Sequence, residues 1–482
     1  MAMYDHFLLL ILVCVSVFGI GQSYEEKTPV TICTQAELTL NLDEIGLTSL
    51  PNNFVSNEFL KTLSLQYNSI EHISVDTFVS VPNLSHLSLA NNNLTTFQLR
   101  PFSTLQNLET LDLNGNCQLP TELDGDLTFP DDDDSDDNII KTPSSYVDVH
   151  YCNFYVDAEL PNLKYLHIEN NRIYKIFTTG SNKLPSLTHV YLSYNLLRKP
   201  RDTTTALKQM APSMTNLYMK NCGITELELL TTVIEVDLDD NNIKSICNRY
   251  CLSSSLSLQK AERLEILSMN NNEISLIEND AFNDTINLKK LDLSRNHLSE
   301  IRDGTFDNLH KLTYLSLEGN EFTTLSGEYT LSGLVNLEYL FFGGNNISYI
   351  STGFFDHLSK LVTLDMSYNR LTSIETTLCS KLTSLQKLSF YGNRLSSIHL
   401  ADLKSIISID LDDNNFTAST YISLVNLPNL ESLYLRENPL RLINVDWLRG
   451  KPENMSISLG SDCAPEKDDF YNSSPIQIIL DD

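Results

Sequence analysis

Basic side chains are scarce in this 482-residue chain. Its 33 Lys and Arg are outnumbered by 62 Asp and Glu, which gives a formal net charge of −29. Nucleic acids and anionic membrane surfaces are polyanions, so this balance disfavours both as partners. It favours a neutral or basic ligand.

Sequence signatures of catalysis are also missing. The chain has no G-x-S-x-G, H-E-x-x-H or phosphate-binding loop, and its ten histidines are scattered. We therefore expect no enzymatic activity, no cofactor and no metal site.

Long apolar runs are absent beyond residues 7–20, FLLLILVCVSVFGI. This run is too short to span a bilayer, and the small and polar residues after it are typical of a secretory signal. A buried strand or an N-terminal anchor is the alternative. We predict a signal peptide over 1–22 and a secreted, extracellular protein without a membrane span.

The dominant pattern that is present is L-x-x-L-x-L-x-x-N, which restarts every 24 residues at Leu264, Leu288 and Leu312. The L-x-L core alternates as a β-strand does. One repeat cannot bury its own apolar edge, so stacked repeats form a continuous core and a parallel ladder of short strands. The Asn at the end of each phrase can satisfy backbone groups where the chain turns inside the stack.

Fifteen such strand phrases can be counted. They start at Leu60, Leu84, Leu108, Leu163, Leu187, Met214, Val233, Leu264, Leu288, Leu312, Leu337, Leu361, Leu385, Ile406 and Leu430. We expect an N-terminal cap over 23–58, repeats over 59–438, and a C-terminal cap and frayed tail over 439–482.

An acidic insert over 117–162 interrupts the repeats, with aspartates at 131–134, 136 and 137. These aspartates lack the D-x-D-x-D-G spacing of a calcium loop. A solvated loop is therefore favoured over a calcium or basic-ligand site. A disulfide between Cys117 and Cys152 would tie the loop at its neck.

Six cysteines besides this pair remain in the predicted mature chain. Cys247 and Cys251 are close enough for a local disulfide, and no ligands at zinc spacing lie nearby. Cys222 occupies a ladder position and is expected to be a buried free thiol. The pairing of Cys33, Cys379 and Cys463 is open: Cys463 can close onto Cys379 or remain free to link a partner chain.

Glycosylation signals agree with a secretory route. Seven N-x-S/T sequons start at Asn83, Asn93, Asn283, Asn346, Asn415, Asn454 and Asn472.

Side chains flanking the central leucines are predicted to face outward and to be the candidate ligand contacts. Tyrosines there are typical of binding surfaces, although they can also simply complete an ordinary sheet face. The candidates are Tyr165, His167, Tyr191, Tyr194, Tyr218, Asp237, Asp239, Tyr314, Tyr339, Phe341, Tyr368 and Tyr391.

The repeat phrase resembles that of extracellular leucine-rich repeat proteins, including Toll ectodomains and secreted insect immune proteins without coiled coils. The resemblance implies an α/β solenoid shaped as a horseshoe, with its parallel β-sheet on the concave face. It also implies binding of a protein or microbial-surface ligand in innate defence. A structural role in cell adhesion or extracellular matrix is the alternative.

Overall fold

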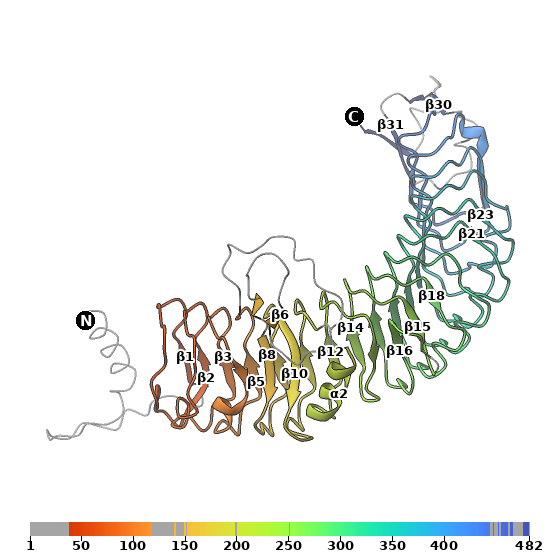
Figure 1. Ribbon diagram of the computed structural model, residues 1–482. Coiled ribbons are helices and arrows are strands. Elements are labelled where there is room, and N and C mark those ends of the chain that lie inside the picture. Colours follow the sequence, from red (N-terminus) through yellow and green to blue (C-terminus); the bar gives the residue numbers. More distant parts are fainter. Residues whose placement is uncertain are drawn as a thin grey trace, which may run out of the picture.

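The computed structural model describes residues 38–117, 139–140, 149–150, 152–197, 200–249, 251–443, 447, 452, 455–460, 463–465 and 476–481. The predicted signal peptide, Cys33, Asn454, Asn472 and most of the acidic insert lie outside these ranges. The described repeats form one curved solenoid, with the two ends of the array far apart (Figure 1).

The concave wall of the solenoid is a parallel sheet that has 18 strands in the described residues. Each strand pairs with the next one along the chain in register, as Leu267, Leu291 and Leu315 do. The central leucines are buried and the residues flanking them are at least partly exposed, which is the alternation predicted from L-x-L. The strands are β1 (Leu38–Asn41), β2 (Leu60–Ser64), β3 (His86–Ser88), β5 (Thr110–Asp112), β9 (Tyr165–His167), β11 (His189–Tyr191), β12 (Asn216–Tyr218), β14 (Glu235–Asp237), β17 (Ile266–Ser268), β19 (Lys290–Asp292), β20 (Tyr314–Ser316), β22 (Tyr339–Phe341), β24 (Thr363–Asp365), β25 (Lys387–Ser389), β27 (Ser408–Asp410), β29 (Ser432–Tyr434), β31 (Ser456–Gly460) and β33 (Gln477–Asp481).

All fifteen predicted phrases contribute a strand to this sheet, and β1, β31 and β33 extend it at the ends. The expected fraying of the C-terminal tail is wrong for residues 477–481. These residues pair with β31 through Ile457↔Ile478 and Leu459↔Leu480. Apolar side chains that continue the strand alternation explain this extension.

Buried asparagines run along the inside of the stack. Asn296, which is 4% exposed, donates from Nδ2 to the carbonyls of Met269 and Leu293 at 2.9 and 3.1 Å. Its Oδ1 accepts the backbone N–H of Ile274 at 3.0 Å. One amide therefore satisfies groups in two neighbouring repeats, which explains why the phrase ends on Asn.

Apart from one helix, the described convex side consists of short strands, turns and buried phenylalanines. Phe282 and Phe306 of consecutive repeats lie 5.7 Å apart, ring centre to ring centre. The convex and peripheral strands are β4 (Phe97–Gln98), β8 (Cys152–Val156), β10 (Ile173–Thr178), β13 (Leu227–Glu228), β15 (Ser245–Cys247), β16 (Ser255–Ser257), β18 (Leu276–Ile277), β21 (Thr324–Leu325), β23 (Tyr349–Ile350), β26 (Ile398–Ala401), β28 (Ile422–Val425), β30 (Leu442–Ile443) and β32 (Ala464–Pro465). Two 3-10 turns, Arg100–Phe102 and Ser419–Tyr421, complete this side.

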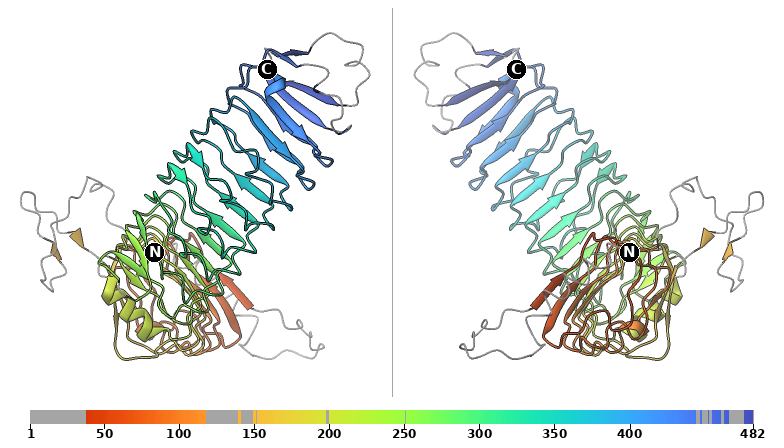
Figure 2. Two further views of the ribbon diagram at one scale, coloured as in Figure 1. Left: turned by 90° about the vertical axis from the view of Figure 1, so that its right-hand side faces the viewer. Right: turned by 90° about the vertical axis from the view of Figure 1, so that its left-hand side faces the viewer.

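One convex element was not predicted: the helix α2 (Pro200–Met210), which lies beside β10 and β13 (Figure 2). Ion pairs of 2.9 Å between Lys175 and Asp202 and of 2.8 Å between Lys208 and Glu228 hold it to both strands. The helix occupies the 27-residue spacing between Leu187 and Met214. No helix in the described part of the chain is long and apolar enough to cross a membrane.

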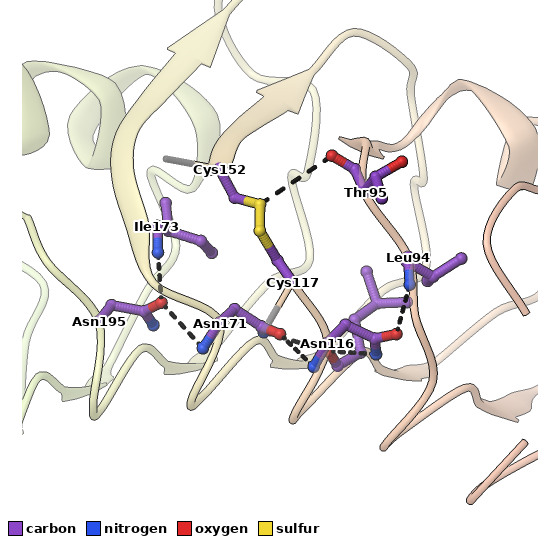
Figure 3. Close-up of a disulfide and its surroundings, with 9 residues drawn as sticks. Leu94, Thr95, Asn116, Cys117, Cys152, Asn171, Ile173 and Asn195 are labelled. Atoms are coloured by element: carbon purple, nitrogen blue, oxygen red, sulfur yellow. Dashed lines mark hydrogen bonds between the residues drawn. A yellow bond between two sulfur atoms is a disulfide. The ribbon is translucent and has the colours of Figure 1, made fainter. Parts of the chain in front are cut away.

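Two disulfides are present among the described residues, and both were predicted. Cys117 and Cys152 join the start of the insert to β8, next to the ladder amides of Asn116 and Asn171 (Figure 3). Cys247 and Cys251 close a short loop after β15. The described part of the insert contains the antiparallel pair β6 (Ile139–Ile140) and β7 (Val149–His150).

The three other described cysteines are buried free thiols. Cys222 takes the ladder position as predicted, and its Sγ donates to the carbonyl of Leu192 at 3.1 Å. Cys379 and Cys463 do not pair with each other, so that predicted alternative is wrong. Both are about 4% exposed, which disfavours a disulfide to a second chain through either one.

Candidate ligand-binding face

Aromatic side chains from three consecutive strands meet on the concave sheet. This group, the Tyr/His patch, comprises Tyr165, His167, His189, Tyr191 and Tyr218. Parallel in-register pairing places the same positions of β9, β11 and β12 side by side. Four of these five residues are among the candidates predicted from the sequence, and His189 flanks Val190 in the same way as Tyr191 does.

The rings of the patch stack along the sheet. His167 and Tyr191 lie 4.2 Å apart and Tyr191 and Tyr218 lie 4.7 Å apart, with both pairs within 5° of parallel. Tyr165 lies 4.7 Å from His189 and is 37% exposed. Stacked rings have few ways to rearrange, so they form a rigid apolar platform with polar edges.

At neutral pH the patch carries no charge. Burial lowers the pKa of His167 and of His189 below the ordinary value of 6.5, so both imidazoles are neutral. Burial also raises the pKa of Tyr191 and of Tyr218, so both hydroxyls stay protonated. A binding partner therefore meets neutral donors and acceptors on an aromatic surface.

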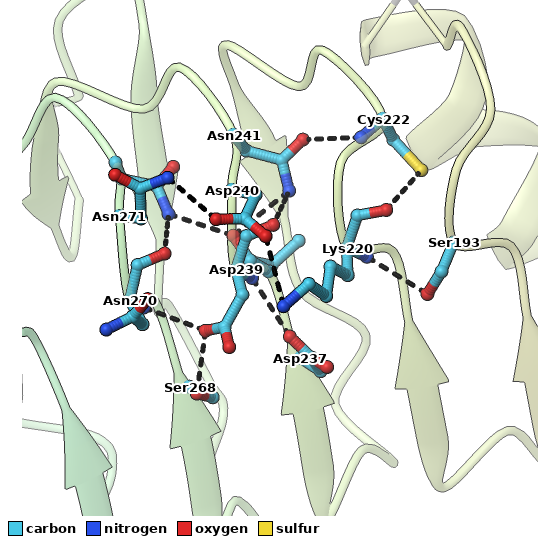
Figure 4. A network of polar contacts seen from close by, with 12 residues as sticks. Ser193, Lys220, Cys222, Asp237, Asp239, Asp240, Asn241, Ser268, Asn270 and Asn271 are labelled. Carbon is cyan, nitrogen blue, oxygen red and sulfur yellow. Dashed lines mark hydrogen bonds and ion pairs between the residues drawn. The ribbon is translucent and has the colours of Figure 1, made fainter.

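Carboxylates adjoin the patch on the next strand, β14. Asn216 donates from Nδ2 to Glu235 at 3.0 Å and lies 3.3 Å from the Tyr218 hydroxyl. Asp237 accepts the backbone N–H of Asp239 at 2.9 Å. Asp239 in turn accepts the Ser268 hydroxyl at 2.7 Å, as Figure 4 shows. Burial raises the pKa of Asp237 and of Asp239.

Asp237 also has a structural role, which aspartates at the same position of other strands share. An aspartate at the end of a strand accepts the backbone N–H two residues later. It does so at Asp112, Asp237, Asp292, Asp365 and Asp410, with distances of 2.8 to 3.1 Å. One oxygen of each carboxylate is thus used by the fold, which leaves the second oxygen for other contacts.

A second aromatic group lies further along the array. Tyr314 and Phe341 lie 5.3 Å apart on β20 and β22, and Tyr339 beside them is 40% exposed. Lys290 lies over the Tyr314 ring, with its Nζ 5.1 Å from the ring centre. This second group therefore already contains a cation.

Four of the predicted candidates lie outside the strands, in the turns that follow them. Tyr194 and Tyr368 have positive φ values of 60° and 51°. The ring centres of Tyr391 and Tyr368 lie 4.7 Å apart. Asp239 is also a turn residue. These residues were predicted together with the outward side chains of the sheet, but they follow the last leucine position of the phrase and lie beyond the end of the strand. The turns place them on the rim of the concave face instead.

Sequence reasoning missed a groove on the convex side. It has a volume of about 470 Å³ and lies between α2, β13, β16 and the Cys247–Cys251 loop. The spacings of 27, 19 and 31 residues between repeats from Leu187 to Leu264 were the available signal. Among the residues described, no group of three or more His, Cys, Asp or Glu could hold a metal ion.

Comparison with known proteins finds similar repeats in part of the chain. A family model for the leucine-rich repeat matches residues 59–117, 262–322, 322–371 and 360–416. Toll-like receptor 2 of Canis lupus familiaris is 32% identical over 206 residues, which are 37% of this chain and 25% of that protein. Toll-like receptor 9 of Mus musculus is 31% identical over 188 residues, 34% of this chain and 18% of that protein. The matched segments thus span a quarter or less of the length of these two relatives.

Solved structures agree on the fold. An LRR protein of Leptospira interrogans superposes with a TM-score of 0.61 at 21% identity, covering 89% of this chain and 95% of that one. Drosophila Toll in its complex with Spatzle gives a TM-score of 0.60 at 18% identity, covering 89% of this chain and 57% of that one. The repeat phrase, the asparagine ladder and these similarities show a leucine-rich repeat solenoid whose repeat array is similar to that of Toll ectodomains.

Proposed function

We propose that this protein is a secreted, extracellular recognition protein of innate defence, which binds a protein or microbial-surface ligand through its concave face and the adjoining rim. The observation that carries this proposal is the Tyr/His patch. It is rigid, partly exposed and uncharged at neutral pH, and it is continuous across three strands. Tyrosine-rich surfaces of this kind are enriched in the parts of interfaces that contribute most binding energy.

The relatives support a role in recognition rather than in catalysis. The matched segments belong to Toll-like receptors, and the Toll structure holds a protein, Spatzle. Of the five sequon asparagines that the structure describes, Asn93, Asn283 and Asn415 are exposed, which supports a secretory route. The route and the ligand are both part of the proposal.

Glycan insertion tests the proposed face without disturbing the core. Replacing Ile266 on β17 by Asn completes an Asn-Leu-Ser sequon with Leu267 and Ser268. Lys387→Asn does the same on β25 with Leu388 and Ser389. A matched control is Lys381→Asn, which creates a sequon with Leu382 and Thr383 in the turn before β25.

The secreted variants are compared for binding to microbial cells and to proteins of the extracellular fluid, after glycosidase treatment has confirmed that each site is occupied. We expect the glycan at position 266, beside the patch, to abolish binding and the glycan at 381 to leave it unchanged. Equal binding by the Ile266→Asn and Lys381→Asn proteins would exclude the concave face. Self-association that a concave glycan blocks would favour the adhesion role instead.

A further inference from the structure

Three partly buried aromatic rings elsewhere in the described part of the protein lie under the chain's own cations. Lys290 lies over Tyr314 at 5.1 Å, Arg436 over Tyr434 at 5.6 Å, and Lys175 over the convex Phe177 at 4.9 Å. A cation over an aromatic face is attracted by the ring quadrupole.

The contact of Arg436 shows a complete cation site built from sheet residues. Its guanidinium lies over the ring of Tyr434 on β29, and its Nε and its NH2 group are each 2.7 Å from the Asp412 carboxylate, which follows β27. An aromatic ring on one strand and a carboxylate beside a neighbouring strand thus hold one guanidinium between them.

The Tyr/His patch has the same two components but lacks an internal cation. Tyr191 and Tyr218 stack on β11 and β12, and Glu235 and Asp237 lie on the adjacent β14. Within the described ranges, no Lys or Arg lies over these rings or pairs with these two carboxylates. The nearby Lys220 is engaged by Asp240 at 3.0 Å.

Neither Glu235 nor Asp237 forms a direct ion pair with a described Lys or Arg; Lys220 lowers the pKa of Asp237 electrostatically, but burial raises it by more. Glu235 accepts from the neutral amide of Asn216, and Asp237 accepts from a backbone N–H. Partly buried carboxylates of like sign destabilise one another unless a cation approaches. The charge at this position is therefore complementary to a cationic group.

The surroundings of the patch also favour access by a large partner. None of the seven sequons starts between residues 94 and 282, a range that includes the whole patch and its carboxylates. The surface through which a glycoprotein binds its partner must not carry glycans of its own. The segment from residue 94 to residue 282 meets that requirement.

We propose that the Tyr/His patch together with Glu235 and Asp237 binds a lysine or arginine side chain from a basic segment of a partner protein. The inference rests on the proposed function and specifies its partner chemistry. The cation stacks on the face of Tyr218 opposite Tyr191, toward β14, while the β14 carboxylates neutralise it, as Tyr434 and Asp412 do for Arg436. The net charge of −29 attracts such a partner from a distance.

Two synthetic peptides test the proposal on the full-length protein. One is a flexible Gly/Ser dodecapeptide carrying three arginines, and the other carries citrulline at the same positions, which keeps the shape but removes the charge. Calorimetric titration is done at about 0.15 M salt, where long-range attraction is screened beyond roughly 8 Å. We expect the citrulline peptide to bind at least about tenfold more weakly, since it forms neither the cation–π contact nor the ion pair.

Variants locate the site. Asp237→Asn with Glu235→Gln, and separately Tyr218→Leu, should each weaken binding of the arginine peptide about fivefold to tenfold. The matched control for Asp237→Asn alone is Asp365→Asn on β24, which likewise removes one charge from an aspartate that accepts a strand-end hydrogen bond, here of 2.8 Å. It should leave the affinity unchanged, and thermal melts check that all variants are folded.

Equal binding of the two peptides, or an equal loss with Asp365→Asn, would overturn the proposal and indicate only general attraction to an acidic protein. The outcome is separable from that of the proposed function. If the glycan at position 266 blocks the natural ligand but Asp237→Asn with Glu235→Gln does not weaken it, the face is confirmed and its cation chemistry is rejected.

Discussion

At the scale of single residues, the ladder asparagine does more for this fold than any surface contact. Asn296 satisfies two carbonyls and one N–H that belong to two different repeats. Substitution to Ala would leave those buried groups without partners. We expect Asn296→Ala to lower the free energy of unfolding by about 2–4 kcal/mol. The exposed Asn308→Ala should change it by less than about 0.5 kcal/mol, and guanidinium unfolding measures both.

The ladder also predicts a stabilising change. Cys222 stands where an amide belongs, and burial raises the pKa of its thiol to about 12, so it remains a neutral, weak donor. An amide of similar size at this position could donate to Leu192 and accept from the Leu197 N–H, as Asn195 accepts from Ile173. We expect Cys222→Asn to raise the free energy of unfolding by about 1 kcal/mol. A loss of stability would show that this turn has adapted to sulfur.

Asp237 links stability to pH. Because burial raises its pKa above the ordinary value of 3.8, the folded state binds this proton more tightly than the unfolded state does. Protonation of Asp237 therefore stabilises the folded state relative to the unfolded state. This contribution is fully present at low pH and is lost as the pH rises through the raised pKa of the folded state. Asp237→Asn should therefore raise the unfolding midpoint at pH 7 but not at pH 3. A gain in stability together with a loss of arginine binding would show that the charge is kept for function.

At the scale of elements, the irregular repeats compensate for one another. The repeat starting at Val233 is preceded by a spacing of only 19 residues and followed by one of 31. The extra length supplies β16, which pairs with β13 on one side and with β15 on the other. One long repeat therefore fills the convex layer that its short neighbour leaves incomplete.

The two disulfides should differ in their contribution to stability. Their sequence separations are 35 residues for Cys117–Cys152 and 4 residues for Cys247–Cys251. Loop entropy of the unfolded chain then gives about 4 kcal/mol for the first and about 2 kcal/mol for the second. Unfolding of the paired Cys→Ser variants measures these values. A larger loss from the pair at 247 and 251 would mean that its loop holds β16 in place.

Sequence reasoning succeeded where side-chain periodicity alone decides the structure. The fifteen strand phrases, the ladder positions and the Cys247–Cys251 disulfide depend on local spacing, and the Cys117–Cys152 disulfide could be predicted because the two cysteines bracket the insert. The helix α2, the filler strand β16 and the convex groove could not. Their formation depends on how much convex space neighbouring repeats leave, and that is a property of the stack.

Within the candidate site the same division holds. The outward positions of Tyr165, His167, Tyr191 and Tyr218 follow from strand alternation. The turn positions of Tyr194 and Tyr368 depend on where each three-residue strand ends, which the leucine pattern does not mark. Whether a carboxylate has a cationic neighbour depends on contacts between repeats, so the contrast between Asp237 and Asp412 is visible only in three dimensions.

At the scale of the whole molecule, stacking joins the short strands into one curved wall. This wall brings together side chains that are some fifty residues apart in the sequence. Tyr165 and Tyr218, for example, belong to the same patch. The groove beside α2 is lined by residues of the convex elements and by none of the concave strands, so a ligand that binds one surface need not touch the other.

Hydrogen–deuterium exchange of the free and ligand-saturated protein tests the central claim most directly. The account predicts that added protection is confined to the concave strands and rims at residues 163–170, 187–195, 214–220 and 233–240. Protection of 200–210 and 248–259 around the convex groove, with the concave strands unchanged, would contradict it.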